Sequence, residues 1–498
     1  MRELLGKAQE EQRRAENPAG GSVSALESEE QYQQAYEETA ARLIKLLSST
    51  ATTKSHVHSI HIYGRRHTRD SFLLSVVRPV FKTRTVSSIL ETAQRAVADL
   101  RRFDIFDDVD LLLDAARDPI AVDGSIDLHM NVKEKPRLFI KTGTEIGNGE
   151  GSMNGSINIR NVFGGAETLE TNISFGTSTS SAFQFCLARP VNASPDARID
   201  INAFNLVRNT PYSSYEEALS GGGVRFKALS KLGYHELSYG AIWRTVDRLA
   251  ETASLSIRNQ AGHSLKCALT HTFTRDRRDD PLLPTQGYFV RAQQELAGVG
   301  GLGDTHHVRN DAEAQVAARL PLGFVLSATL RGGLLYTLDG APSRIVDRFQ
   351  LGGSTSVRGF RTGGIGPRDR SANRDGMDPH GILVAFPPCC WITEDALGGD
   401  AYWAGGVSLT SPLPRLSEYP VRAHLFVNAG TLVPYNNNNT PQQTLESLTR
   451  SPSVAAGLGL IYRHSIARLE LNFCVPLAIA MGDQYKKGLQ IGLGLSFL

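Results

Sequence analysis

The sequence contains few cysteines and no long apolar run. Its 498 residues include five cysteines, an odd number, and their spacing matches no zinc-binding pattern. A chain of this length can build its core without disulfide bonds, so we expect a reducing or redox-neutral compartment. No uninterrupted apolar stretch approaches the roughly 18 residues of a membrane-crossing helix, so we expect no such helix.

An excess of charge of either sign is also absent. Lys and Arg total 53 and Asp and Glu total 51, which gives a formal net charge of +2. This balance excludes nucleic-acid binding through a large basic surface, so we expect no nucleic-acid partner. The first 30 residues hold seven glutamates and no apolar core, which argues against both a secretory signal and an acid-poor transit peptide.

Motifs for catalysis or cofactor binding are missing as well. The glycine-rich stretch 363–366 lacks the lysine of a phosphate-binding loop, and Ser354 is outside any Gly-x-Ser-x-Gly elbow. The pair Cys389-Cys390 lies in an apolar stretch without a histidine at useful spacing. Four histidines gather in one short region without a nearby cysteine: His56, His58, His61 and His67. We therefore expect no catalytic, metal or cofactor site and no enzymatic activity.

The pattern of the chain changes near residue 137. Residues 1–26 are polar and predict a tail. Residues 27–48 carry apolar side chains at helical spacing and predict an amphipathic helix, either docked on another surface or solvated. Residues 53–136 predict a small α/β domain in the order strand, helix, helix, strand, strand. Two helices on a small sheet can bury one modest core.

From residue 137 to residue 498 apolar and polar residues alternate persistently. Successive side chains on a strand point to opposite faces, so each segment has one apolar and one polar wall. We count sixteen segments, the first at 137–147, the sixth at 221–231 and the last at 487–498. They are about 10 residues long, which suits a tilted strand that crosses a bilayer. A soluble β-sandwich would also alternate, but number and length favour a mainly β fold, a 16-stranded antiparallel transmembrane β-barrel over 137–498.

One connection in this region, at about residues 336–400, is long enough to indicate a function. It contains Val357, Arg358, Gly359 and Phe360 shortly after two glycines. Glycine permits close backbone approach, and arginine offers a fork of donors to polar groups on an inner barrel wall. The loop tip either folds into the lumen or forms a surface turn with an exposed arginine.

The motif Gly-Gly-x-x-x-Val-Arg-Gly-Phe at 352–360 resembles the loop motif of the outer-membrane β-barrel assembly superfamily. Bacterial BAM and mitochondrial SAM barrels belong to this superfamily, and residues 274–288 and 426–431 are similar to two of its further motifs, in the expected order. The resemblance implies that Arg358 holds the loop against the barrel wall. The superfamily more often has aspartate at the position of Asn428, so Asn428 and Glu470 are the candidate partners.

Residues 53–136 resemble a POTRA domain in their order and length, and a single such domain is similar to the mitochondrial SAM branch. That resemblance implies an integral protein of the mitochondrial outer membrane with its N-terminal domain in the intermembrane space. It implies an insertase that folds β-barrel precursors and inserts them into the lipid bilayer. The partners that it implies are peripheral SAM subunits on the cytosolic side, the TOM channel and MICOS.

The first and last barrel strands are expected to form a lateral gate. Residues 486–493 resemble the sorting signal in the last strand of β-barrel precursors, so this segment takes the place of a client strand. Glycines weaken both strands, and a weak seam could open. We expect the gate at Leu138, Ile140, Gly143, Gly147, Gly488, Ile491, Gly492, Leu493 and Gly494. The alternatives are a two-partner-type secretion transporter, a passive outer-membrane channel on the same scaffold, and a soluble β-rich binding protein.

Overall fold

The computed structural model describes residues 52–498 apart from 123, 148–149, 177–178, 371–393, 414–418, 436–440, 465–466 and 495–496. The predicted tail at 1–26, the predicted helix at 27–48 and the Cys389-Cys390 pair lie outside the described residues. The chain divides into two compact units, residues 1–135 and 136–498. None of the helices in the described part is both long and apolar enough to cross a membrane.

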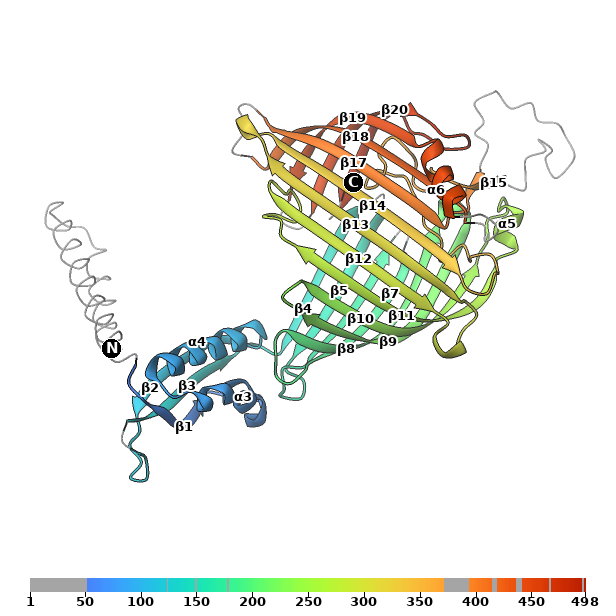
Figure 1. Cartoon of the computed structure of the whole chain (residues 1–498). Helices are drawn as coiled ribbons and strands as arrows, with labels where there is room; N and C mark the ends of the chain where they lie inside the picture. The colour runs from blue at the N-terminus through green and yellow to red at the C-terminus, as the bar shows by residue number, and fades with distance from the viewer. Residues whose placement is uncertain are drawn as a thin grey trace, which may run out of the picture. The chain divides into compact units, whose positions relative to one another are not determined.

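Within its described residues, the first unit holds a three-stranded sheet and two α-helices (Figure 1). Its elements are β1 (His56–Tyr63), α3 (Asp70–Val77), the 3-10 turn η1 (Arg78–Lys82), α4 (Val86–Arg102), β2 (Phe106–Ala115) and β3 (Ser125–Glu134). The sheet order is β1-β3-β2, with β1 parallel and β2 antiparallel to β3. These elements follow the order expected from the sequence.

Helix α4 forms because one apolar stripe recurs at helical spacing and its start is capped. Thr85 and Ser88 form a reciprocal capping box at its first turn. The buried residues of the stripe are Ile89, Ala93, Ala96 and Leu100. They share one small core with Leu73 of α3 and Leu128 of β3, all fully buried. The apolar burial of one helix stripe and one sheet face stabilises this unit.

The second unit is one sheet of sixteen antiparallel strands, as predicted (Figure 1). Its strands are β4 (Leu138–Gly147), β5 (Glu150–Arg160), β6 (Thr168–Gly176), β7 (Thr179–Pro190), β8 (Ala197–Thr210), β9 (Tyr215–Leu229), β10 (Tyr234–Asp247), β11 (Gly262–Asp276), β12 (Gly287–Ala297), β13 (His307–Arg319), β14 (Val325–Thr337), β17 (Ala401–Pro412), β18 (Val421–Val433), β19 (Ser453–Arg463), β20 (Arg468–Ala478) and β21 (Gly488–Gly494). Each strand pairs with its neighbour in the order of the chain.

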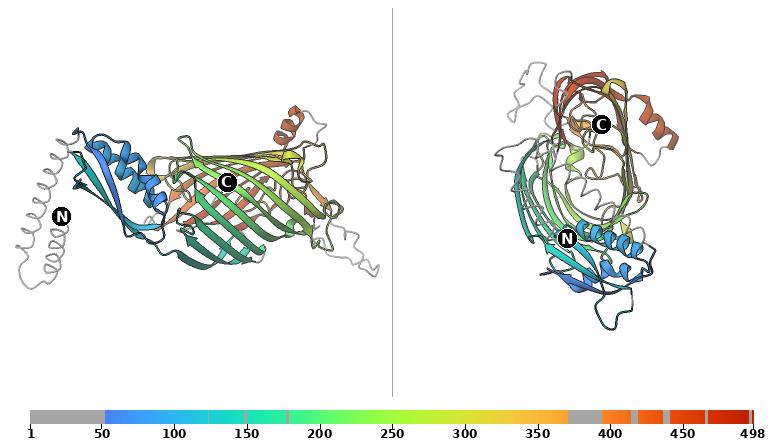
Figure 2. Two further views of the ribbon diagram at one scale, coloured as in Figure 1. Left: turned by 90° about the horizontal axis from the view of Figure 1, so that it is seen from below. Right: turned by 90° about the vertical axis from the view of Figure 1, so that its left-hand side faces the viewer.

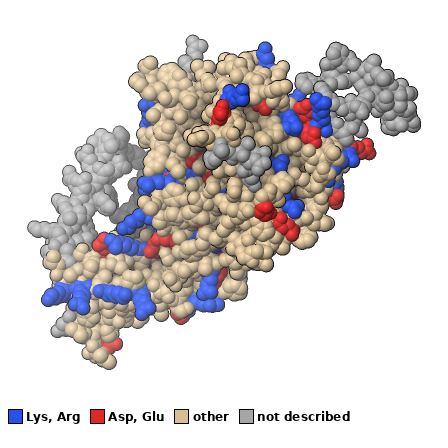
Figure 3. All heavy atoms as spheres, turned by 45° about the vertical axis from the view of Figure 1, so that its right-hand side comes forward, with Lys and Arg blue, Asp and Glu red and all other residues tan. Residues whose placement is uncertain are grey.

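Alternation along the strands places apolar side chains outside and polar ones inside. In β20, Leu469 and Leu471 are each 38% exposed on the outer face, whereas Glu470 and Asn472 are fully buried on the inner face. Figure 3 shows that most of the surface in that view carries neither acidic nor basic side chains. An apolar outer wall and a polar interior are what a barrel in hydrocarbon requires.

The sixth strand and the last strand differ from the bounds expected for them. The sixth strand, β9, begins at Tyr215 rather than at 221, and Gly221, Gly222 and Gly223 lie inside it. These glycines are places of close strand packing, since a Cβ on Gly223 would lie 2.5 Å from the Tyr239 carbonyl oxygen. The last strand, β21, ends at Gly494 rather than at Leu498.

The long connection between β14 and β17 enters the interior of the sheet. It contains a short hairpin of β15 (Arg368–Arg370) and β16 (Glu394–Ala396). Its buried apolar residues pack against inward-facing wall residues in one cluster of Leu335, Phe349, Leu351, Val357, Phe360, Ile365, Ala404, Leu432, Ala455 and Leu498. The loop therefore folds into the lumen, and the alternative of a surface turn is wrong for the residues around 357–360.

Short helices occupy the connections at the ends of the strands. At the rim where β4 ends, called the far rim here, they are η2 (Pro211–Ser213), α5 (Leu255–Arg258), η3 (Val299–Gly301) and α6 (Pro441–Arg450), and η4 (Pro321–Gly323) lies at the opposite rim. The Trp403 Nε1 of β17 donates to the Leu448 carbonyl of α6 at 2.8 Å, which fixes this helix to the wall.

The curled sheet is not closed by strand pairing. Its hydrogen-bonded order runs from β21 at one edge to β4 at the other, and in the described residues no pairing joins these two strands. Figure 2 shows the curled sheet from two further sides. Each terminal strand therefore has one edge whose backbone groups lack a strand partner, which is costly in hydrocarbon unless another strand binds there.

Candidate functional site

The loop tip is buried against the inner wall. Val357, Arg358 and Phe360 are each at most 1% exposed. Gly359 has a φ of +86°, a left-handed conformation that favours glycine, and a Cβ there would lie 2.7 Å from the Ala455 Cβ. Glycine at position 359 meets both requirements, the left-handed backbone conformation and the lack of space for a side chain. The loop tip can therefore pack closely against β19.

Arg358 binds a carboxylate that lies 112 positions later in the sequence. Its Nε and Nη2 donate to Glu470 of β20 at 2.9 and 3.2 Å, in the bidentate geometry typical of strong charge-assisted bonds. Glu470 also accepts from the Arg468 guanidinium at 2.5 Å and from Asn472 Nδ2 at 2.8 Å. Two arginines thus share one fully buried carboxylate.

Asn428 of β18 also contacts Arg358, in either orientation of its amide. In one orientation its Oδ1 lies 3.4 Å from Arg358 Nη1. In the other, its oxygen accepts from the Arg358 backbone N–H at 3.0 Å. Both candidate partners from the sequence therefore reach the loop arginine, and Glu470 is the one that supplies opposite charge. Since Asn428 is neutral, the ion pair forms with β20.

The sequence did not indicate that the end of the last strand takes part in this site. Arg358 Nη1 donates to the Leu498 carbonyl oxygen at 2.6 Å. The Phe497 ring lies 5.6 Å from the Arg358 guanidinium and 5.0 Å from that of Arg468. Strict alternation would place Phe497 with the outward residues of β21, so a continuous strand through 498 was the wrong expectation. The two cations attract the aromatic face inward.

All nine residues expected at the gate lie in the two terminal strands, β4 and β21. On β4 the outer wall is apolar, with Leu138 56% and Ile140 61% exposed. The glycines of β21 do more than weaken the strand, because they also leave space for neighbouring side chains. A Cβ on Gly492 would lie 3.0 Å from the Phe497 ring. Gly494 similarly leaves room for Thr355 of the loop. These glycines let the loop and the chain end approach the strand.

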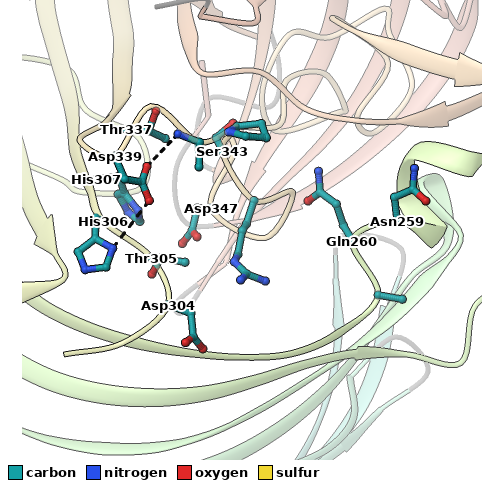
Figure 4. A pocket seen from close by; sticks show the side chains of 14 residues that line it. Asn259, Gln260, Asp304, Thr305, His306, His307, Thr337, Asp339, Ser343 and Asp347 are labelled. Carbon is teal, nitrogen blue, oxygen red and sulfur yellow. Dashed lines mark hydrogen bonds and ion pairs between the residues drawn. The ribbon is translucent and has the colours of Figure 1, made fainter. Parts of the chain in front are cut away.

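A second charged cluster lies near the far rim and offers the ligand types that metals use. One ligand atom each from Glu295, His307 and Asp347 lies within 4.8 Å of the others. Lys266 Nζ already lies 2.9 Å from Asp347, and Arg244 Nη1 lies 2.7 Å from the same carboxylate. The positive charge at this position is therefore supplied by side chains. His307 and Asp347 line a cavity of about 310 Å³. Figure 4 shows both side chains among the residues around it.

Comparisons with known proteins agree with this geometry. The Omp85 superfamily domain matches residues 161–497. A SAM50-like protein of Schizosaccharomyces pombe is 37% identical over 474 residues, which cover 93% of this chain and 95% of the relative. The sorting and assembly machinery component 50 homolog of Homo sapiens is 33% identical over 450 residues, 89% of this chain and 90% of the relative.

Among solved structures, the fold is similar to that of BamA from Haemophilus ducreyi lacking POTRA domains 1–3. The TM-score is 0.71 at 18% sequence identity, and the match covers 88% of this chain and 84% of that one. At this identity the likeness concerns the fold.

Proposed function

The chain belongs to the Omp85 superfamily, and from this membership and the lack of pairing between β4 and β21 in the described residues we propose that it is a β-barrel insertase. Its relatives include a SAM50-like protein and a sorting and assembly machinery component 50 homolog. In the proposed reaction the last strand of a client precursor pairs with the open edge of β4. The client then leaves sideways into the bilayer between β4 and β21.

The observation that carries this proposal is the missing pairing between the two ends of the sheet. The backbone N–H and C=O groups at the edge of a strand in hydrocarbon cannot form hydrogen bonds to water. A client strand that pairs with this edge supplies the missing hydrogen bonds, and this favours its binding. Strand addition to an exposed edge is a general mode of peptide recognition. Backbone bonding and burial of the client's apolar face supply the driving force, so the proposal needs no nucleotide and no enzymatic step.

The lumen-directed loop favours this function over an open pore. Arg358 and the apolar cluster around Val357 occupy the interior, beside the inner faces of β18, β19 and β20. A passive channel does not require a loop held inside the lumen by a buried ion pair, and this chain has such a loop. A two-partner-type secretion transporter on the same scaffold is the second candidate, which would carry a soluble client through rather than sideways.

The location and the partners complete the proposal. An outer-membrane barrel with SAM50 relatives is proposed to sit in the mitochondrial outer membrane, with residues 53–136 as a POTRA-like domain in the intermembrane space. Peripheral SAM subunits would bind the far rim from the cytosolic side. Contacts with the TOM channel and with MICOS belong to the proposal through the superfamily resemblance.

The experiment is photo-crosslinking during insertion of a mitochondrial β-barrel precursor. A photoreactive residue replaces Thr142 on the outer face of β4, and a matched control replaces Leu330 on the outer face of β14, far from the seam in strand order. We expect the precursor's last strand to crosslink at position 142 and not at 330. Equal yields at both positions would contradict the gate, and crosslinks to a translocating soluble client would favour the secretion transporter.

A further inference from the structure

The inner loop is bound along the last segment of the chain, at several successive points. Gly366 N donates to Asp483 Oδ1 at 2.9 Å, and Gln484 N donates to the Gly364 carbonyl at 2.8 Å. Lys486 N donates to the Gly359 carbonyl at 2.8 Å. These bonds fix residues 483–486, the turn that leads into β21, against residues 359–366 of the loop.

Gln490 continues this attachment into the strand itself. It lies on the inner face of β21 and is 5% exposed. Its Oε1 accepts from Gly359 N at 3.0 Å, and its Nε2 lies 3.5 Å from the Phe360 carbonyl oxygen. The Gln490 side chain therefore bonds to two backbone groups at the centre of the loop tip, the N–H of Gly359 and the carbonyl of Phe360.

Residues 497 and 498 also lie inward, against the same loop. β21 stops at Gly494, and Phe497 and Leu498 are 4% and 5% exposed. The Leu498 carbonyl accepts from Arg358, so the loop holds the last segment from residue 483 to residue 498. All of these bonds use the inner side or the end of β21. The edge of β21 that would face β4 is not used by them.

We propose that Gln490 is the positioning residue by which the loop retains this chain's own last strand, so that the edge of β4 stays available to a client strand. The proposal rests on the insertase function proposed above and adds how the chain's own last strand is kept from competing. If β21 were free, it would be the nearest strand to β4 and would close the seam. In the sorting-signal pattern of residues 486–493, position 490 accepts any residue, so a client's last strand does not need this glutamine.

The first test measures the attachment without any client. Hydrogen exchange of the full-length protein in lipid nanodiscs is compared among wild type, Gln490→Leu, Gln490→Glu and the outward-facing control Leu489→Ala. Gln490→Leu removes both polar atoms, so the Gly359 and Lys486 amides should exchange about tenfold faster. Gln490→Glu keeps an acceptor for Gly359 N and should retain most of its protection. Unchanged exchange in Gln490→Leu would overturn the proposal.

Gln490→Asn serves where the leucine variant does not fold. It keeps an amide but is one methylene shorter, so it does not reach Gly359 N. Heat-dependent gel mobility reports the folded fraction of each variant. The expected result is the same faster exchange at Gly359, and normal protection in Gln490→Asn would count against the role.

The second test measures competition at β4. Thr142→Cys and Ile491→Cys, both on outward-facing positions, are joined by a short bis-maleimide within one chain. When Gln490→Leu is added, the yield of this internal crosslink should rise, and crosslinking of a client's last strand to position 142 should fall. An internal yield equal to that of the parent would contradict the proposal. Loss of client crosslinking in the parent itself would instead contradict the insertase function, while the exchange result would still stand for Gln490.

Discussion

Arg358 and Glu470 are 112 positions apart in the sequence and are joined by two hydrogen bonds of 2.9 and 3.2 Å, with neither side chain more than 1% exposed. Arg468 also binds Glu470. Glu470 keeps Arg468 as a partner within β20, whereas Arg358 meets this carboxylate only while the loop lies inside the barrel. The pair therefore links the position of the loop to the stability of the wall at β20.

Replacing Arg358 by alanine should destabilise the folded barrel strongly. It removes the hydrogen bonds that Arg358 donates to Glu470, which keeps Arg468 as its cation, and a hydrogen bond to a charged group typically contributes about 1.5–3 kcal/mol. The measurement is the unfolding midpoint in denaturant, followed by heat-dependent gel mobility in detergent.

A double variant with Glu470→Leu provides the control for the charge argument. Because Arg468 also pairs with Glu470, this double variant leaves Arg468 buried without a carboxylate and should be less stable than Arg358→Ala alone. A double variant as stable as Arg358→Ala would show that the pair acts through packing rather than charge.

Replacing Asn428 by aspartate should rescue the loss of Glu470. Glu470→Gln removes the negative charge between Arg358 and Arg468. The side-chain oxygen of Asn428 lies 3.4 Å from Arg358 Nη1 in one amide orientation, so Asn428→Asp would place a new carboxylate beside the same guanidinium. We expect Glu470→Gln to lower the unfolding midpoint and Asn428→Asp to restore a large part of it. No recovery in the double variant would exclude Asn428 as an alternative anchor.

Replacing Gly359 by alanine should displace the loop tip. The φ of +86° and the 2.7 Å approach to the Ala455 Cβ oppose any side chain there, and left-handed backbone in a non-glycine residue costs about 1 kcal/mol or more before the clash is counted. The matched control is Gly143→Ala in β4, where a Cβ would meet nothing within 4 Å. Protease sensitivity of the loop should increase in Gly359→Ala and not in the control.

Locking the seam should stop client insertion. Cysteines at Thr142 and Ile491 joined by a short bis-maleimide would hold β4 and β21 together on their outer faces. Ile491 is preferable to Gly492, because a side chain at 492 would press on the Phe497 ring. Insertion of a radiolabelled precursor should stop in the double variant and continue in each single variant or after a mono-functional maleimide. Normal insertion by the locked form would refute the gate.

The first unit should lose stability in acid through Glu134. Burial alone would raise the pKa of this carboxyl, but hydrogen bonds from the Arg66 amide, from the hydroxyl and amide of Thr68 and from the His67 amide together lower it from 4.5 to about 2. A lowered folded pKa stabilises the fold above the unfolded value, and this stabilisation is lost as the pH falls from about 4.5 towards 2.

Hydrogen exchange at 66–77 in the full chain checks this prediction. Protection of these amides should decrease between pH 5 and pH 2 more than intrinsic exchange explains, and Glu134→Gln should remove this part of the pH dependence. An equal pH dependence in wild type and variant would assign the effect to other carboxyls.

The sequence by itself determined the number of barrel strands and the presence of the inner loop motif. Alternation with period two is a local consequence of strand geometry, so each strand can be recognised from about ten neighbouring residues. Prediction from this alternation failed where the local pattern and the tertiary packing differ. The sixth strand was expected at 221–231, with three successive glycines at its start, whereas the structure places these glycines inside a strand that begins at Tyr215 and packs closely on the Tyr239 backbone.

Only the tertiary structure decided which carboxylate binds the loop arginine, where the last strand ends and whether the seam is closed. Arg358 meets Glu470 because curling of the sheet brings β20 to the loop, and no local pattern records a contact across 112 positions. The alternation continues through Phe497, yet Arg358 and Arg468 hold that ring inside. The contacts of this ring with two cations from distant parts of the sequence therefore override the local alternation.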